Sequence, residues 1–242
     1  MWLPRYDRQV TIPGWDQEKL RRAHVAVVGV GGLGSAVLYY LTAAGVGRIS
    51  LVDGDVVEES NLNRQVLHFT SDVGRHKVVS ALEKLKSLNP EVTLEPLSSE
   101  LTAENVAILG NPDVLVDALD DLKTRLIVNE YAVENRIPLV HAAVEGFQGL
   151  VTTIVPGSTP CLACIYPEPK ARATSPVVGV TAGLLGLMEA AEVLKLLLGL
   201  GEELSGRLLM VDILSWEFRS IEAKFRRGCP VCGGRKDAES SE

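Results

Sequence analysis

Gly29-Val30-Gly31-Gly32-Leu33-Gly34 lies between an apolar run at 25–28 and a helix-forming run at 35–41. A buried strand, a glycine turn and a helix start in this order expose backbone N–H groups at the positive end of a helix, where phosphate binds. The residues expected to surround that phosphate are Gly29, Gly31, Gly32 and Gly34. The pattern does not identify the ligand, because most chains that carry it bind a nicotinamide or flavin dinucleotide.

Predicted strands and helices alternate on both sides of this turn. Strands are expected over 24–30, 48–53, 91–98, 113–119, 138–145 and 149–155, and helices over 33–44, 73–88, 102–109 and 122–135. This alternation predicts a doubly wound, Rossmann-like α/β sheet. After Pro156 come a loop rich in turn-forming residues, an apolar helix over 177–200, and two strand-like runs over 208–214 and 216–225. These last runs predict an antiparallel hairpin that extends the sheet.

Charge and hydropathy exclude several classes of protein. A net charge of −7 without a long basic run argues against nucleic acid as the main partner. The apolar segment 177–200 contains Glu189, Glu192 and Lys195, so it does not suit a membrane span. Its first half is apolar nearly all round, which indicates either a dimer interface or a deep core helix. No secretory signal opens the sequence, so we expect a cytoplasmic protein.

An acidic residue follows the glycine turn at a spacing that suits a nucleotide. Asp53 lies 24 residues after Gly29, at the end of the predicted strand over 48–53. A carboxylate at this position can accept hydrogen bonds from ribose hydroxyls. The alternative is a turn aspartate, which suits Asp55 better.

Basic residues follow the same turn. Lys77 lies in the first turn of a predicted helix, where a cation costs roughly 0.3–1 kcal/mol unless an anion binds there. The alternative is a solvated charged turn. Further polar and basic groups come from Ser60, Asn61 and Arg64, and from Arg5 and Arg8 in a segment that could equally be a surface arm. A dinucleotide needs few such charges, whereas a triphosphate needs more.

Asp120 and Asp121 end the apolar strand predicted over 113–119. Ligands of an open α/β sheet lie at the C-terminal strand ends, where a carboxylate suits magnesium bound to phosphates. Helix capping is the alternative, and capping by Asp121 is compatible with metal binding by Asp120.

All four cysteines occur in two C-x-x-C pairs. They are Cys161, Cys164, Cys229 and Cys232. In a chain without an export signal, two such pairs predict a structural tetrahedral zinc site; a redox motif or disulfides are the alternatives. The histidines His24, His68, His76 and His141 show no ligand spacing, and His141 either lines a substrate channel or is a buried, hydrogen-bonded side chain.

With these residues the sequence resembles the ThiF/MoeB/HesA family. Members of this family are relatives of the ubiquitin-activating enzymes, and they adenylate the C-terminal glycine of ubiquitin-like sulfur carriers. The resemblance rests on 5–9, the glycine turn, 60–65, 74–77, Asp120 and both cysteine pairs, and it runs from Arg5 to Gly233. The pattern is closest to that of the molybdopterin-synthase adenylyltransferases. It implies a single ThiF-type adenylation domain over 1–242. The implied parts are an N-terminal arm (1–23), a nucleotide-binding core (24–156), a segment with crossover loop, interface helix, C-terminal strands and zinc knuckle (157–235), and a disordered tail (236–242).

The resemblance also implies roles for single residues. Asp53 would bind the ribose of ATP, while Asn61, Arg64 and Lys77 would hold its phosphates and Asp120 would hold magnesium. Arg8 would reach the triphosphate of the other subunit in a homodimer. Ser60 and Asp121 complete the implied nucleotide contacts. The partner would be a ubiquitin-like sulfur carrier ending in Gly-Gly, and its carboxylate would attack the α-phosphorus.

Two departures from the family pattern shape the expected activity. The family often has asparagine at the position of Asp121, so an extra negative charge lies near the nucleotide. The loop 171–175 lacks the cysteine of relatives that form a thioester or persulfide, which predicts adenylation without a covalent step and a separate sulfur donor. The alternatives are an NAD-dependent oxidoreductase, an ATP-dependent dehydratase of a tRNA nucleoside and a non-catalytic carrier-binding scaffold. The pathway, whether molybdenum cofactor, thiamine or tRNA thiolation, stays open.

Overall fold

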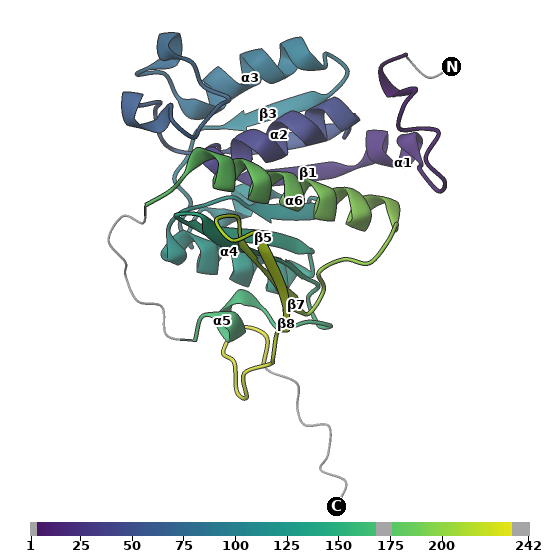
Figure 1. The fold of residues 1–242 in the computed structure, drawn as a ribbon, viewed down its shortest axis with the longest axis vertical. Helices are drawn as coiled ribbons and strands as arrows, with labels where there is room; N and C mark the ends of the chain where they lie inside the picture. Colours follow the sequence, from purple (N-terminus) through teal and green to yellow (C-terminus); the bar gives the residue numbers. More distant parts are fainter. Residues whose placement is uncertain (1–3, 168–175, 234–242) are drawn as a thin grey trace, which may run out of the picture.

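The computed structural model describes residues 4–167 and 176–233. Its centre is one eight-stranded sheet in the order β3-β2-β1-β4-β5-β6-β7-β8 (Figure 1). The strands are β1 (His24–Val28), β2 (Arg48–Val52), β3 (Thr93–Leu97), β4 (Val114–Asp117), β5 (Leu139–Glu145), β6 (Gln148–Ile154), β7 (Arg207–Asp212) and β8 (Glu217–Glu222). β1 to β5 pair in parallel, and β6 to β8 continue the sheet antiparallel. The predicted fold class is confirmed.

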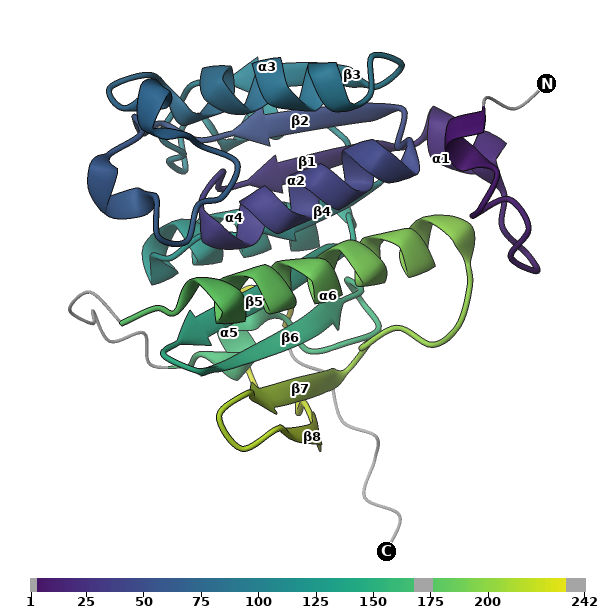
Figure 2. The same cartoon turned by 45° about the horizontal axis from the view of Figure 1, so that its top comes forward.

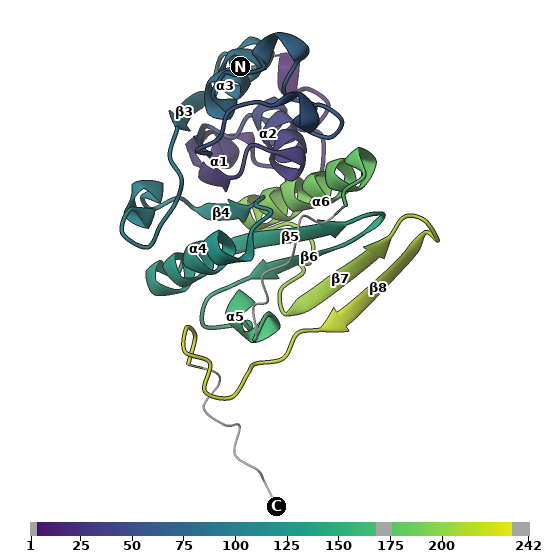
Figure 3. The same cartoon turned by 90° about the vertical axis from the view of Figure 1, so that its left-hand side faces the viewer.

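Helices cover both faces of the sheet, as Figure 3 shows. The helices are α1 (Gln17–Arg22), α2 (Gly32–Ala44), α3 (Lys77–Leu88), α4 (Leu122–Asn135), α5 (Leu162–Ile165) and α6 (Gly179–Leu198). α2, α3 and α6 contribute to one hydrophobic cluster, and α4 and α5 contribute to a second one on the opposite face. This two-sided cover is what a parallel sheet requires, because its strands are apolar on both faces.

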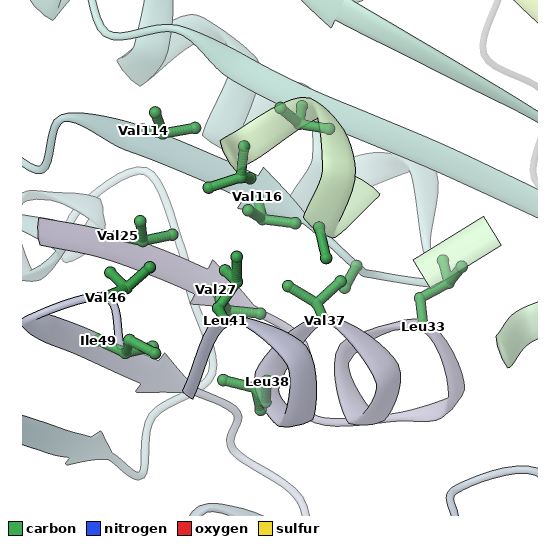
Figure 4. Packing of buried hydrophobic residues seen from close by; sticks show 14 of the residues in the cluster. Val25, Val27, Leu33, Val37, Leu38, Leu41, Val46, Ile49, Val114 and Val116 are labelled. Atoms are coloured by element: carbon green, nitrogen blue, oxygen red, sulfur yellow. The ribbon is translucent and has the colours of Figure 1, made fainter. Parts of the chain in front are cut away.

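β1 shows how the sequence produces this layering. Val25 and Val27 belong to the cluster on the face that α2 covers, where Val27 lies near Leu41 and Val25 lies near Val46 (Figure 4). The alternate residues Ala26 and Val28 belong to the other cluster. Successive side chains of a strand point to opposite faces, so an uninterrupted apolar run buries both.

α6 packs against α2 and the sheet within the same chain, and residues such as Leu185 and Val193 are fully buried. The core-helix interpretation of this segment is therefore confirmed for the single chain. Its outer side still exposes Val180, with 66% of that residue accessible. A dimer interface on this side remains a prediction.

Two predicted helices are wrong in extent. The helix expected over 73–88 begins only at Lys77, because Gly74 has a φ of +87°, which a right-handed helix cannot contain. A short 3-10 turn, Thr70–Asp72, precedes that glycine. The helix expected over 102–109 is a 3-10 turn, Val106–Leu109, and the Asn105 side chain accepts a hydrogen bond from the N–H of residue 102. The predicted tail at 236–242 and the loop 171–175 lie outside the described residues.

The chain reverses its winding direction between β1 and β4, which are neighbours in the sheet. In open α/β sheets the ligand crevice lies at this point, beyond the C-terminal ends of the strands. Figure 2 shows the N-terminal segment with α1 at the opposite end of the strands. Among the described residues, none of the helices has the length and apolar character needed to cross a membrane.

Candidate active site and zinc centre

The glycine turn after β1 depends on two of its glycines for its own shape. Gly29 has a φ of +99°, and a side chain there would place its Cβ 2.5 Å from the carbonyl oxygen of Ala118. A Cβ on Gly34 would collide with the carbonyl of Gly29. Both positions therefore require glycine, the first for backbone conformation and the second for close approach.

The other two glycines differ in their surroundings. A Cβ on Gly32 would lie 3.1 Å from the Cβ of Ala182 on α6, so this glycine allows helix packing. A Cβ on Gly31 would meet only the side chain of Gln65, at 3.5 Å. Among the described residues, no hydrogen bond uses the N–H groups of residues 31 to 34. These four donors at the start of α2 are available to an anion.

Asp53 braces this turn. Its Oδ2 accepts the N–H of Val30 at 2.8 Å, and its Oδ1 accepts the N–H of Asp55 at 2.8 Å. Sequence reasoning assigned Asp53 to a ribose and missed these two backbone contacts. Each carboxylate oxygen keeps a second lone pair, so ribose binding stays compatible with the geometry.

Lys77 is buried rather than solvated, which overturns the charged-turn alternative. Its side chain is 8% exposed, and its Nζ lies 2.8 Å from Asp55 Oδ2 and 3.9 Å from Asp53 Oδ1. A cavity of about 170 Å³ is lined by Asp55, Val56, Glu58, Asn61 and Lys77. The structure thus brings two of the predicted phosphate ligands, Asn61 and Lys77, to one hollow.

Arg64 approaches the glycine turn from the segment that carries Asn61. A Cβ on Gly32 would lie 3.7 Å from Arg64 Cγ, which places the two residues side by side. The guanidinium donates to the carbonyl of Ser60 and to Asn63 Oδ1, both at 3.0 Å. It therefore has no acidic partner among the described residues and retains its charge for a ligand.

The turn between β4 and α4 faces the glycine turn. Its Ala118 N–H donates to the carbonyl of Val28 at 2.9 Å, which joins it to the end of β1. Asp121 caps α4 by accepting the Thr124 N–H at 2.8 Å, so the capping interpretation is confirmed. Asp120 is exposed, and within the described part of the chain no hydrogen bond or ion pair involves its carboxylate. Such a free carboxylate fits the oxygen preference of magnesium.

Arg8 lies far from these residues in its own chain. The neighbouring Gln9 donates to the carbonyl of Ala44 at the end of α2, and Arg5 donates to the carbonyl of Leu88 at the end of α3. α2 starts at the glycine turn and its 13 residues span about 18 Å. Arg8 therefore lies away from the glycine turn of its own chain, and its contact with the nucleotide of a second subunit stays a prediction.

The four cysteines converge on one point. Their Sγ atoms all lie within 4.8 Å of one another, with 3.8 Å between Cys161 and Cys229 and 3.5 Å between Cys164 and Cys232. Four sulfurs about 2.3 Å from a central zinc would lie at such separations. All four are free thiols, so disulfides do not account for the pairs. Burial opposes ionisation of Cys229, but the N–H groups of Cys232 and Val231 lower its pKa to about 6.

The sequence matches the model of the ThiF family over residues 6–231. This chain belongs to the ThiF family. A sulfur carrier protein adenylyltransferase of Thermus thermophilus is 44% identical, with 96% of this ThiF-family chain and 91% of that protein covered. A SAMP-activating enzyme E1 of Haloferax volcanii is 42% identical, with coverages of 96% and 89%.

Solved structures match the fold of this ThiF-family chain as well. A crystal structure of Escherichia coli MccB with MccA-N7isoASN has a TM-score of 0.86 at 24% identity, covering 96% of this chain and 76% of that one. A structure of MccB with AMPCPP and MccA has a TM-score of 0.83 at 25% identity, with 90% of this chain and 68% of that chain covered.

Sequence reasoning missed a buried cluster next to the β4–α4 turn of this ThiF-family chain. Asp117 and His141 are both 0% exposed, with His141 Nδ1 2.7 Å from Asp117 Oδ2 and His141 Nε2 3.1 Å from the Tyr166 hydroxyl. Burial lowers the pKa of His141, while Asp117 raises it. The other oxygen of Asp117 accepts the N–H of Leu119 at 3.2 Å, and Arg125 donates to the Leu119 carbonyl. His141 is thus a buried, hydrogen-bonded side chain that helps to hold the turn carrying Asp120.

Proposed function

We propose that this chain is an ATP-dependent adenylyltransferase that activates the C-terminal glycine carboxylate of a ubiquitin-like sulfur carrier ending in Gly-Gly. The observation that carries the proposal is the 44% identity, over nearly the full length of both chains, to a protein named sulfur carrier protein adenylyltransferase. A buried lysine and an arginine that has no acidic partner among the described residues lie beside the glycine turn and support it, because they provide more positive charge than a dinucleotide needs.

In this proposal the ATP phosphates lie over the start of α2. Gly31 and Gly32 provide N–H groups, while Asn61, Arg64 and Lys77 contact the phosphate oxygens from the other side. When the nucleotide binds, the Lys77 ammonium leaves the Asp55 carboxylate, whose side chain is 75% exposed, and pairs with phosphate. The ribose hydroxyls contact Asp53. Ser60 and Asp121 lie at the margins of the nucleotide.

The chemical step needs alignment more than proton transfer. A carrier carboxylate oxygen forms a bond to the α-phosphorus while the bond from that phosphorus to the bridging oxygen breaks, which gives an acyl-adenylate and pyrophosphate. The carboxylate is already ionised near pH 7, so no general base is required. Alignment of the reacting groups contributes about 7–11 kcal/mol, and Arg64 and Lys77 stabilise the charge on the leaving pyrophosphate. Asp120 would hold magnesium, which neutralises further phosphate charge.

Two features of the chain define the limits of the proposed reaction. All four cysteines of the sequence belong to the cluster that we assign to zinc, so none would be free to form a thioester with the carrier. Sulfur therefore comes from a separate donor. Arg8 acts from the second subunit of a homodimer, since its own glycine turn lies at the other end of α2.

Carrier-dependent exchange of pyrophosphate into ATP tests the proposal. We expect exchange with a carrier ending in Gly-Gly and none when its last glycine is deleted. Carriers from molybdopterin, thiamine and tRNA-thiolation pathways, compared in parallel, identify the pathway. Lys77→Ala and Arg64→Ala should each lower exchange by about 100-fold, because each removes a charge from the transition state.

Lys86→Ala is the matched control, because Lys86 is an exposed lysine on the same helix as Lys77. It should leave exchange unchanged. Tight NAD⁺ binding without ATP binding would refute the proposal in favour of an oxidoreductase. Carrier binding without formation of AMP would refute it in favour of a non-catalytic scaffold that binds the carrier.

A further inference from the structure

We propose that His68 is a positioning residue for the nucleotide phosphates: by holding the carbonyl of Val30 it turns the N–H of Gly31 toward the phosphate site. The inference rests on the proposed function and adds a residue that the sequence pattern did not single out. His68 is 4% exposed and lies between α3 and the glycine turn. It does not touch the nucleotide itself but acts through one peptide group.

The contacts of His68 form a continuous chain from an ion pair to the glycine turn. Asp72 Oδ2 lies 2.6 Å from Lys84 Nζ, and the same Nζ lies 2.8 Å from Ser80 Oγ. Ser80 Oγ is 2.9 Å from His68 Nδ1, and His68 Nε2 is 2.9 Å from the carbonyl oxygen of Val30. Asp72 and Ser80 are as inaccessible to water as His68.

The partners fix where each proton lies. A backbone carbonyl only accepts, so His68 Nε2 must carry the hydrogen, and the neutral ring then accepts at Nδ1. The Ser80 hydroxyl donates to that Nδ1 and accepts from the Lys84 ammonium, whose position Asp72 holds. Burial lowers the pKa of His68, and Lys84 and Lys77 lower it further, while the Val30 carbonyl and Asp72 act in the opposite direction. The neutral Nε2–H form is therefore the one that the surroundings stabilise.

The hydrogen bond between His68 Nε2 and the Val30 carbonyl also sets the direction of the Gly31 N–H. In a trans peptide the C=O of one residue and the N–H of the next point in opposite directions, and no cis peptide occurs among the described residues. The Val30 carbonyl points inward to His68, so the Gly31 N–H points away from the core, at the start of α2. On its other side, Val30 donates its own N–H to Asp53. Val30 is thus held at both of its backbone polar groups.

Nucleotide binding to the zinc-loaded, full-length chain tests this role. ATP and adenosine are titrated calorimetrically into the wild type, His68→Phe and His68→Gln. Phe keeps a planar ring without a donor, whereas the Gln amide can still donate to the Val30 carbonyl. We expect His68→Phe to bind ATP about tenfold more weakly and adenosine within about twofold of the wild type, since one oriented donor to phosphate is lost. His68→Gln should recover most of the ATP affinity.

Equal losses for ATP and adenosine, or no loss of ATP affinity in His68→Phe, would overturn the inference. A wild type that binds NAD⁺ instead of ATP would refute the proposed function alone, and a phosphate-selective loss of NAD⁺ affinity in His68→Phe would still support the role of His68. If His68→Phe does not fold, an NMR measurement on the wild type tests the inference instead. Its two-bond ¹H–¹⁵N spectrum should show the Nε2–H form of His68, and the Nδ1–H form would contradict the inference.

Discussion

The turn after β1 and the turn after β4 face each other at the proposed phosphate site, yet they are held in different ways. The turn after β1 owes its shape to its own glycines, with Gly29 in a left-handed conformation and Gly34 against the preceding carbonyl. The turn after β4 contains no glycine and depends on buried side chains from α4 and β5, namely Arg125 and His141, acting with Asp117. The first turn therefore depends mainly on its own glycines, with Asp53 and His68 holding Val30 from outside, whereas the second depends on side-chain contacts.

Gly34→Ala should have the largest effect, because its Cβ collides with the Gly29 carbonyl and the turn cannot keep its shape. We expect ATP binding to become undetectable by calorimetry, with a loss of more than about 4 kcal/mol in the free energy of unfolding. Gly183→Ala on α6 is the control, since a Cβ at that position would meet no atom within 4 Å. Equal effects of the two variants would show that the turn is not locally specified.

Asp117→Asn tests whether buried side chains hold the turn after β4. The variant removes the charge between His141 and Arg125 in a fully buried position, which should lower the free energy of unfolding by about 3 kcal/mol. Urea unfolding followed by tryptophan fluorescence measures this loss. A change below about 0.5 kcal/mol would mean that the backbone holds the turn without these side chains.

Asp72→Asn tests the ion pair behind the glycine turn and its dependence on pH. Burial acts to raise the pKa of Asp72, but the Lys84 ammonium outweighs it and lowers the pKa from 3.8 to about 2. A depressed folded-state pKa stabilises the protein above pH 4 and this stability is lost as the pH falls toward 2. The variant should therefore be less stable by about 2 kcal/mol at pH 7, and the difference should disappear as the pH falls below about 2.

Acid titrations of unfolding, run on both proteins, measure this convergence. Glu83→Gln is the control, because Glu83 is an exposed carboxylate on α3, the helix that carries Lys84, and it pairs with Arg75, which precedes that helix. Its difference from the wild type should stay much smaller than that of Asp72→Asn at every pH, because an exposed ion pair contributes little to stability. A pH-independent difference for Asp72→Asn would contradict the assignment of the pKa shift to Lys84.

Asp121→Asn should have the smallest effect. Asparagine caps a helix about as well as aspartate, so the stability of the protein should stay within about 0.5 kcal/mol of the wild type. Removing one negative charge beside the predicted phosphate site should tighten ATP binding by about twofold to threefold at low salt. Weaker binding in the variant would show that the Asp121 carboxylate contributes to the nucleotide site.

Local patterns explain which parts of the site could be predicted. The glycine turn, Lys77 at the start of its helix and the paired cysteines each follow from residue types at short, fixed spacings. The predicted start of α3 was wrong because the apolar stripe begins only at Val78, and it does not show that the left-handed backbone of Gly74 excludes 73–76 from the helix. The contact of Asp53 with the Val30 N–H could not be predicted, because it joins the ends of two different strands.

Residue spacing by itself determined the order of strands and helices along the chain, the glycine turn after β1 and the two cysteine pairs of the candidate zinc site, because short-range geometry enforces each of them. Tertiary packing decided what the buried histidines do. His68 meets Ser80 and Val30, 12 and 38 residues away, and His141 meets Asp117, 24 residues away. No local pattern encodes such partners, since a histidine in the core is defined by whatever donors and acceptors the fold places beside it.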